Sequence, residues 1–315
     1  MGMASAHTAS PAGQWARRPR QTLKRTVVVS GRGYWSGQEN RVELRPAGVN
    51  AGIVFVRDDL GGVRVPATVA CRVEASSRTN LQVGVAMVEM VEHLLSSLAG
   101  LGVDCCEVGL TAAELPGLDG SAAAYVEAID QAGIASLDQP INPLIVTEPI
   151  SIGEPDSPAR IEAMPPTIPG LSVSYDLEYP GQPIPPQQFG MAITPQRYRS
   201  ELAAARTFLP EEDARRLQAS GRGLTVSTSD LLVFGPTGPI GNTLHWPDEC
   251  ARHKALDVVG DLVLAGRPIW ADVRASRSGH RLNAALVAAV LAADRTEPIL
   301  PSAGGLVEPE GGSNG

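Results

Sequence analysis

The sequence contains few aromatic residues and few cysteines. Phe, Trp and Tyr make up only 4% of its 315 residues, so aliphatic side chains must fill the core. The four cysteines show neither the CxxC spacing of a zinc site nor a secreted disulfide framework. We therefore expect buried thiols in a reducing compartment, and any metal ligands must come from His, Asp and Glu.

Long apolar runs and clusters of basic residues are also missing. No stretch approaches the roughly 20 apolar residues that span a bilayer, and no apolar segment of a signal peptide follows the basic start ARRPRQTLKR. The net charge is -8, and Lys and Arg form no stripe that could follow a phosphate backbone. We expect a cytoplasmic protein that neither inserts stably into a membrane nor binds nucleic acid.

What is present fits a globular chain of two α+β domains. Hydrophobic residues make up 43% of the chain and charged residues 19%. The proline-punctuated stretch DQPINPLIVTEPI separates two halves near residue 141, which predicts domains over residues 21–140 and 141–297. Residues 1–20 lack periodicity and predict a disordered arm, and residues 298–315 predict a flexible tail.

Each half shows strand-like runs followed by helical patterns. The first half opens with three β-branched or alternating runs, at residues 24–31, 41–47 and 52–59. An apolar stripe that begins at Met87 then predicts a core helix, with Gly100 and Gly102 as its stop signals. The second half repeats the order, which favours two related layers of sheet and helix.

The segment ARHKALDVVGD carries an imidazole and two carboxylates at steps of four, at His253, Asp257 and Asp261. Residues four apart on a helix lie one turn above another, so His253 and Asp257 can converge on one point. This spacing is typical of two zinc ligands. A hydrolytic zinc site needs a third protein ligand and an open position for water.

Two more histidines lie beside predicted elements. His93 follows Glu92 on the core helix, so His93 could bind a metal while Glu92 reaches the attacking water. His280 opens the last helix, where Asp261 could compensate the positive end of the helix dipole. The residues alone leave alternatives open, because one His-x-x-x-Asp pair can arise by chance and His93 can be an ordinary core histidine.

Five ordered segments carry a resemblance to a known family. They are VEHLLSSLAGLGVD (91–104), ELPGLDGSAAAYVEAIDQAGI (114–134), ARTF (205–208), RHKALDVVGDL (252–262) and SGHRLNAAL (278–286). With QTLKR, GRGYWSG and ELRPA near the start, they make the sequence resemble the UDP-3-O-acyl-N-acetylglucosamine deacetylase family over about residues 20–295.

The resemblance implies a fold and a reaction. The fold is two similar α+β domains, packed as a β-α-α-β sandwich with the active site between them. The reaction is zinc-dependent removal of the acetyl group from UDP-3-O-(3-hydroxyacyl)-N-acetylglucosamine, the committed step of lipid A biosynthesis. The implied partners are this acylated UDP-amino sugar and one Zn2+ per chain, and we expect a monomer.

Carried over by motif, the resemblance makes His93, His253 and Asp257 the zinc ligands and Glu92 the general base. Zinc would act as Lewis acid and as generator of the nucleophile. Two imidazoles and one carboxylate with an open position also suit ferrous iron, so the choice of metal stays open.

Five further residues receive roles from the same resemblance. Thr207 and Lys254 would stabilise the oxyanion, because they supply donors where negative charge develops. His280, kept protonated by Asp261, would serve the departing amine as general acid or electrostatic partner. Phe208 would contact the substrate.

The sequence departs from the family's pattern at Tyr34, Trp35 and Tyr179, at residues 224–230 and at Thr147. The last two departures concern substrate contacts, so one alternative is a zinc deacetylase of another N-acyl amino sugar. A second alternative is a non-catalytic binding protein that retains the fold. The intact set of metal-ligand and acid/base residues argues against it.

Overall fold

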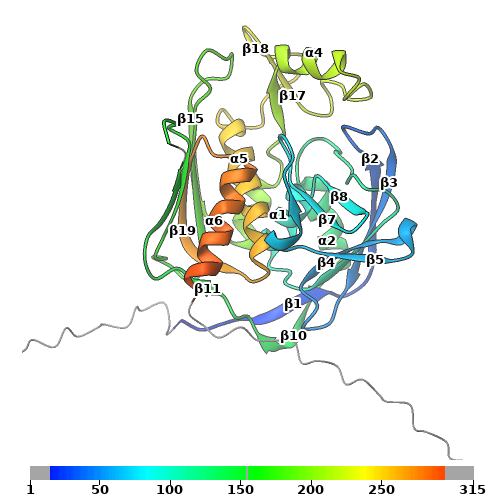
Figure 1. Cartoon of the computed structure of the whole chain (residues 1–315), viewed down its shortest axis with the longest axis vertical. Helices are drawn as coiled ribbons and strands as arrows, with labels where there is room; N and C mark the ends of the chain where they lie inside the picture. The colour runs from blue at the N-terminus through cyan, green and yellow to red at the C-terminus, as the bar shows by residue number, and fades with distance from the viewer. Residues whose placement is uncertain (1–14, 154, 295–315) are drawn as a thin grey trace, which may run out of the picture.

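Two mixed β-sheets flank a central group of helices in the computed structural model, which describes residues 15–153 and 155–294 (Figure 1). The first sheet has the order β2-β3-β9-β4-β5. Its strands are β2 (Val27–Arg32), β3 (Glu39–Pro46), β9 (Cys106–Leu110), β4 (Ile53–Arg57) and β5 (Val63–Pro66).

The second sheet has the order β12-β13-β19-β14-β15, and β11 also pairs with β19. Its strands are β11 (Leu144–Ile145), β12 (Ile150–Gly153), β13 (Arg160–Met164), β19 (Ile269–Ser276), β14 (Leu171–Leu177) and β15 (Gln187–Ala192). The central strand of each main sheet comes last of that sheet's strands in the sequence. This strand, β9 or β19, pairs in parallel with β4 or β14 on one side and antiparallel with β3 or β13 on the other. The two sheets therefore share one topology.

Four longer helices lie between these sheets in Figure 1. They are α1 (Glu92–Leu101), α2 (Ala123–Ala132), α5 (Glu249–Leu262) and α6 (His280–Ala293). Helices α1 and α5 approach closely because Gly260 has no side chain. A Cβ there would lie 2.1 Å from the carbonyl oxygen of Glu92.

Three smaller sheets accompany the two main ones. They are β1 (Pro19–Leu23) with β10 (Ile134–Pro140), then β6 (Arg72–Val73), β7 (Asn80–Val83) and β8 (Ala86–Glu89), and finally β16 (Phe208–Pro210), β17 (Leu232–Gly235) and β18 (Gly238–Pro239). The shorter helical elements are α3 (Pro195–Arg197), α4 (Glu211–Ala219), the π-helical η4 (Tyr198–Leu202), and the 3-10 helices η2 (Asp58–Leu60), η3 (Val69–Cys71) and η5 (Val263–Ala265). Helix α4 lies with β17 and β18 at one end of the molecule (Figure 1).

The expected α+β class is confirmed, but the expected start of the first core helix is wrong. Met87 belongs to β8, and α1 begins at Glu92, because the chain pairs with β7 until Met90 takes a positive φ of 61°. Gly102 ends the helix as expected, with a φ of 77°. Gly100 lies inside it, where a Cβ would lie 2.3 Å from the Tyr198 ring.

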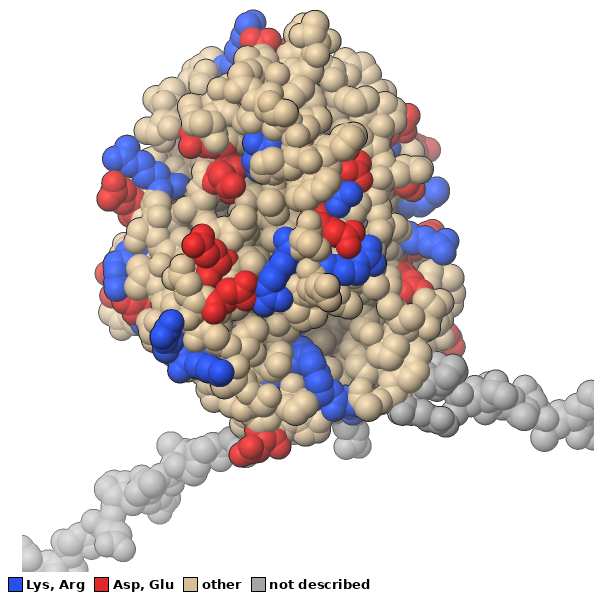
Figure 2. Space-filling view, turned by 180° about the vertical axis from the view of Figure 1, so that it is seen from behind, with Lys and Arg blue, Asp and Glu red and all other residues tan. Residues whose placement is uncertain are grey.

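Strand β1 begins at Pro19, inside the segment predicted as an arm. Residues 1–14 and the predicted tail at 298–315 lie outside the described residues. The domain boundaries, the monomeric state and the cytoplasmic location stay predictions. Within the described ranges, no helix is long and apolar enough to cross a bilayer. Acidic and basic side chains are intermixed on the face seen in Figure 2.

Candidate active site

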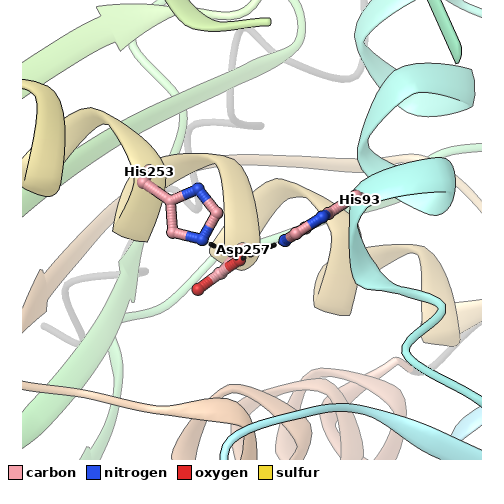
Figure 3. Close-up of side chains that lie close together, drawn as sticks. All are labelled: His93, His253 and Asp257. Atoms are coloured by element: carbon pink, nitrogen blue, oxygen red, sulfur yellow. Dashed lines mark ion pairs between the residues drawn. The ribbon is translucent and has the colours of Figure 1, made fainter. Parts of the chain in front are cut away.

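Helices α1 and α5 bring together His93, His253 and Asp257 (Figure 3). His93 is the second residue of α1, and the other two lie one turn apart on α5. His93 Nε2 lies 3.8 Å from Asp257 Oδ1, and His253 Nε2 lies 3.5 Å from the same oxygen. All three side chains are buried, and one ligand atom of each lies within 4.8 Å of the others.

The hydrogen bonds around these residues leave three ligand atoms directed at one point. His253 Nδ1 donates to the Ala205 carbonyl at 3.0 Å, which leaves its Nε2 lone pair free. Asp257 Oδ2 accepts from Lys254 Nζ at 2.9 Å, but Asp257 Oδ1 is buried and has no hydrogen-bond partner among the described residues. A buried carboxylate oxygen is rarely left so. Two imidazole nitrogens and this oxygen fit a zinc or ferrous ion.

The charges of these groups also suit a metal. Burial, reinforced by His253, lowers the pKa of His93 to about 3, and burial lowers the pKa of His253 as well. Burial opposes ionisation of Asp257, but Lys254 and the neighbouring histidines outweigh it and hold the pKa of that carboxyl below its usual value. Neutral imidazoles and an ionised carboxylate are the forms that bind metal.

Glu92 lies beside His93 in the first turn of α1 and is buried. Its Oε2 accepts a hydrogen bond from the backbone N–H of Thr79 at 3.0 Å. Burial raises the pKa of Glu92 to about 7, although the charge of His280 opposes this rise. A carboxylate with a pKa near neutral is suited to general base catalysis.

His280, the first residue of α6, forms a buried pair with Asp261 of α5. Its Nδ1 donates to Asp261 Oδ2 at 2.8 Å, and Asn283 Nδ2 donates to the same oxygen at 2.8 Å. Burial lowers the pKa of His280, as a helix N-terminus also does. The charge and hydrogen bond of Asp261 outweigh burial and, with Glu92, raise this pKa to about 9. The imidazole is therefore protonated at neutral pH.

Thr207 and Lys254 each contact one of the candidate ligands. Thr207 Oγ1 donates to the Gly120 carbonyl at 3.0 Å and lies 3.3 Å from His253 Nε2. Lys254 Nζ contacts Asp257, whose charge raises the pKa of Lys254 against the effect of burial. Lys254 can present an N–H donor to a bound oxygen, and the Thr207 hydroxyl can do so when its proton turns away from the Gly120 carbonyl.

Phe208 begins β16, directly after Thr207. Its ring meets Tyr179 and His253 edge to face, with centroids 5.9 and 6.1 Å apart. Lys254 Nζ lies 5.8 Å from the Phe208 ring centroid. Phe208 thus forms an apolar wall beside the metal ligands.

A cavity of about 1070 Å³ connects these groups. All the predicted site residues line it except Asp261, which lies behind His280. The cavity continues from the metal ligands toward α4, where the apolar residues Leu217, Leu231 and Val233 line it together with charged side chains of α4 such as Arg215 and Arg216. It is large enough for an extended ligand with one apolar branch.

The structure adds site residues that the sequence reasoning missed. Thr79 contacts both Glu92 and Asp261, and no periodicity or motif marks it in the sequence. Asn283 follows His280 by three residues in the SGHRLN segment, a helical spacing that could have revealed it.

A buried ion pair also supports the site from behind. Arg206 Nε lies 2.7 Å from Glu249 Oε1, and both side chains are almost fully buried. Arg206 precedes Thr207, and Glu249 opens α5, so the pair joins the segment just before β16, which carries Thr207, to the helix that carries His253. Neither residue was predicted to act here.

Comparison with known proteins identifies the family. The family model described as UDP-3-O-acyl N-acetylglycosamine deacetylase matches residues 20–292. Similar curated proteins, each named UDP-3-O-acyl-N-acetylglucosamine deacetylase, come from Solibacter usitatus (38% identical, covering 86% of this chain and 90% of the relative), Anaeromyxobacter sp. (37%, 88% and 89%) and Stenotrophomonas maltophilia (37%, 86% and 90%). The chain therefore belongs to the UDP-3-O-acyl N-acetylglycosamine deacetylase family.

Proposed function

We propose that this chain hydrolyses the acetamide of UDP-3-O-(3-hydroxyacyl)-N-acetylglucosamine and releases acetate, in the committed step of lipid A biosynthesis. The observation that carries the proposal is the unpartnered Oδ1 of Asp257, which faces two imidazole nitrogens in a large cavity. A buried base and a buried, protonated histidine line the same cavity. The names of the relatives support the substrate.

In this proposal His93, His253 and Asp257 hold one zinc ion. Their donor set, two neutral imidazoles and one carboxylate, supports zinc. When bound, zinc polarises the amide carbonyl and lowers the pKa of water.

Glu92 takes the proton from the water that attacks the carbonyl carbon. Its carboxylate lines the cavity next to His93, and its pKa near 7 lets it accept a proton at neutral pH. The hydrogen bond from Thr79 fixes Oε2 and leaves the other carboxylate oxygen for the water.

Three donors then act on the substrate. The Thr207 hydroxyl and the Lys254 ammonium stabilise negative charge on the carbonyl oxygen. His280 directs Nδ1 at Asp261, so its Nε2–H can transfer a proton to the nitrogen of the departing amine. The C–N bond breaks to give acetic acid and the neutral amine. Transfer of the acid's proton to His280 and of the Glu92 proton to the amine then restores the enzyme, and acetate and the ammonium leave. Phe208 packs against the substrate.

We further propose that the two halves are the similar domains of a β-α-α-β sandwich. The shared topology of the two main sheets and the helices between them support this. The site then lies between the two domains, because α1 of the first half carries Glu92 and His93, and α5 of the second half carries the other two ligands, His253 and Asp257.

The test is a deacetylase assay on zinc-loaded protein with UDP-3-O-(3-hydroxymyristoyl)-N-acetylglucosamine. Glu92→Ala and His280→Ala should each lower kcat by about 100- to 10,000-fold and keep one zinc per chain. Glu127→Ala, an exposed glutamate on α2, is the matched control and should behave as wild type. A wild-type protein that binds zinc but leaves this substrate intact would overturn the substrate assignment.

A second candidate substrate is another N-acyl amino sugar. The changed segment 224–230 favours it, since Val226, Ser227 and Thr228 line the cavity. A comparison of kcat/KM for the acylated UDP-sugar with that for its unacylated and non-nucleotide analogues decides between them. Preference for an analogue would establish the second candidate.

A further inference from the structure

Thr79 is completely buried between the two helices of the site and is 0% exposed. It immediately precedes β7, and its polar atoms form hydrogen bonds with three groups. The backbone N–H donates to Glu92 Oε2 at 3.0 Å, and the hydroxyl donates to Asp261 Oδ1 at 2.6 Å. The carbonyl accepts from the N–H of Val91, just before α1, at 3.2 Å.

The position of Thr79 is itself fixed by its neighbours. Asn80, the next residue, accepts the N–H of Met90 on its side-chain oxygen at 3.3 Å. The β7–β8 hairpin is thus anchored to the turn that leads into α1. A hydroxyl held in this way can fix the orientation of a carboxylate on another helix.

Asp261 needs such an orienting contact because its two oxygens have different tasks. Oδ2 accepts hydrogen bonds from His280 and Asn283, whereas Oδ1 accepts one from Thr79. A partial rotation of the carboxylate about its Cβ–Cγ bond would move Oδ2 away from His280 Nδ1 and weaken this contact. The Thr79 hydroxyl opposes that rotation.

We propose that Thr79 is a positioning residue that aligns both proton-transfer groups, since one residue holds the Glu92 carboxylate and the carboxylate that orients His280. This inference rests on the proposed function for the roles of those groups. The contacts themselves do not depend on it.

The hydroxyl also keeps the negative charge of Asp261 next to His280. Without it the carboxylate can turn away, so the imidazolium holds its proton less tightly. The charged groups that act on or lie beside His280 are Asp257 and Asp261 of α5, Glu92 of α1, Glu74 after β6 and Arg281 of α6. Removal of the Thr79 hydroxyl alters none of the others directly.

The test compares Thr79→Val with Thr79→Ser, which restores a hydroxyl. We expect Thr79→Val to lower kcat about 10- to 100-fold, as the loss of a hydrogen bond to a charged group does, with KM and zinc content close to wild type. Thr79→Ser should recover most of the rate. Thr22→Val is the matched control, because Thr22 is also buried and hydrogen-bonded but lies in β1.

A second readout needs no substrate. An NMR titration of the histidine rings in the zinc-loaded protein, with His280→Gln to assign the signal, should show a lower pKa for His280 in Thr79→Val than in wild type. This readout separates a failure of the inference from a failure of the proposed function.

Three results would overturn the inference. They are a Thr79→Val rate equal to that of Thr22→Val, a Thr79→Ser rate as low as that of Thr79→Val, and an unchanged titration of His280. If Thr79→Val does not fold, Thr79→Ala removes the same hydroxyl with less steric change and takes its place in both measurements.

Discussion

Asp257 and Asp261 lie about one turn apart on α5, yet their carboxylates have opposite surroundings. Asp261 accepts hydrogen bonds on both oxygens, from Thr79, His280 and Asn283. Asp257 has Lys254 on one oxygen and no hydrogen-bond partner on the other. Both side chains are nearly inaccessible to solvent.

The difference separates two uses of a buried carboxylate. A saturated carboxylate orients its neighbours and is stabilised by them. A carboxylate with a free oxygen bears a desolvation cost that only another positive group can offset. For Asp257 we propose that this group is a metal ion, because the unprotonated imidazole nitrogens of His93 and His253 lie 3.8 and 3.5 Å from the free oxygen, Oδ1.

Among the variants that test this difference, a replacement of Asp257 should have the largest effect on zinc binding and turnover. Asp257→Asn removes the anionic oxygen, so we expect zinc affinity to fall by more than about 100-fold, beyond the 10- to 100-fold cost of losing an outer partner. Turnover should fall to background. Elemental analysis after dialysis measures the zinc, with Asp248→Asn at the start of the same helix as control. Retention of zinc with wild-type affinity would contradict the assignment of Asp257 as ligand.

Replacement of Asp261 should separate catalysis from metal binding. Asp261→Asn removes the main cause that raises the pKa of His280, so burial should bring that pKa down from about 9. The alkaline limb of the kcat profile then moves to lower pH, and kcat at neutral pH falls about 100-fold or more. Zinc content should stay at one per chain. Loss of zinc in parallel with activity would show that the two carboxylates act as one unit.

The sequence was informative where one helix carries the groups. The period of α5 places His253 one turn from Asp257, and the neighbours Glu92 and His93 share the start of α1. These placements follow from the geometry of a single helix. The assignments of roles to these residues stay predictions until the variants are measured.

The sequence was uninformative where contacts join distant segments. Thr79 forms hydrogen bonds with residues 13 and 182 positions away in the sequence, and no local sequence pattern encodes such contacts. Met87 was misplaced because a short apolar run suits a strand as well as a helix. Helix α4 was not predicted, since its sequence EEDARRLQA buries no residue and carries no apolar stripe.

The pH dependence of stability tests the Asp261 pair in the folded protein. The pKa of His280 is raised from 6.5 to about 9, so its contribution is complete below pH 6.5 and disappears as the pH rises through 9. At about 1.36 kcal/mol per pKa unit, the free energy of unfolding should fall by up to about 3 kcal/mol over this range. Urea unfolding of wild type and His280→Gln measures the difference. Parallel pH curves for the two proteins would contradict the raised pKa.

Substitution of Gly260 should have the smallest effect on zinc binding and turnover. It tests whether the close approach of α1 to α5 sets the distance from the two aspartates to α1. Gly260→Ala would place a Cβ 2.1 Å from the Glu92 carbonyl oxygen, and backbone atoms cannot move aside as a flexible side chain can. We expect the free energy of unfolding to fall by about 1–3 kcal/mol, although alanine favours helices. Zinc should also bind more weakly, since His93 moves with α1 relative to Asp257. Gly48→Ala is the control, because a Cβ there meets nothing within 4 Å. Equal stability and zinc affinity in the two variants would mean that the close approach of α1 and α5 does not set the ligand geometry.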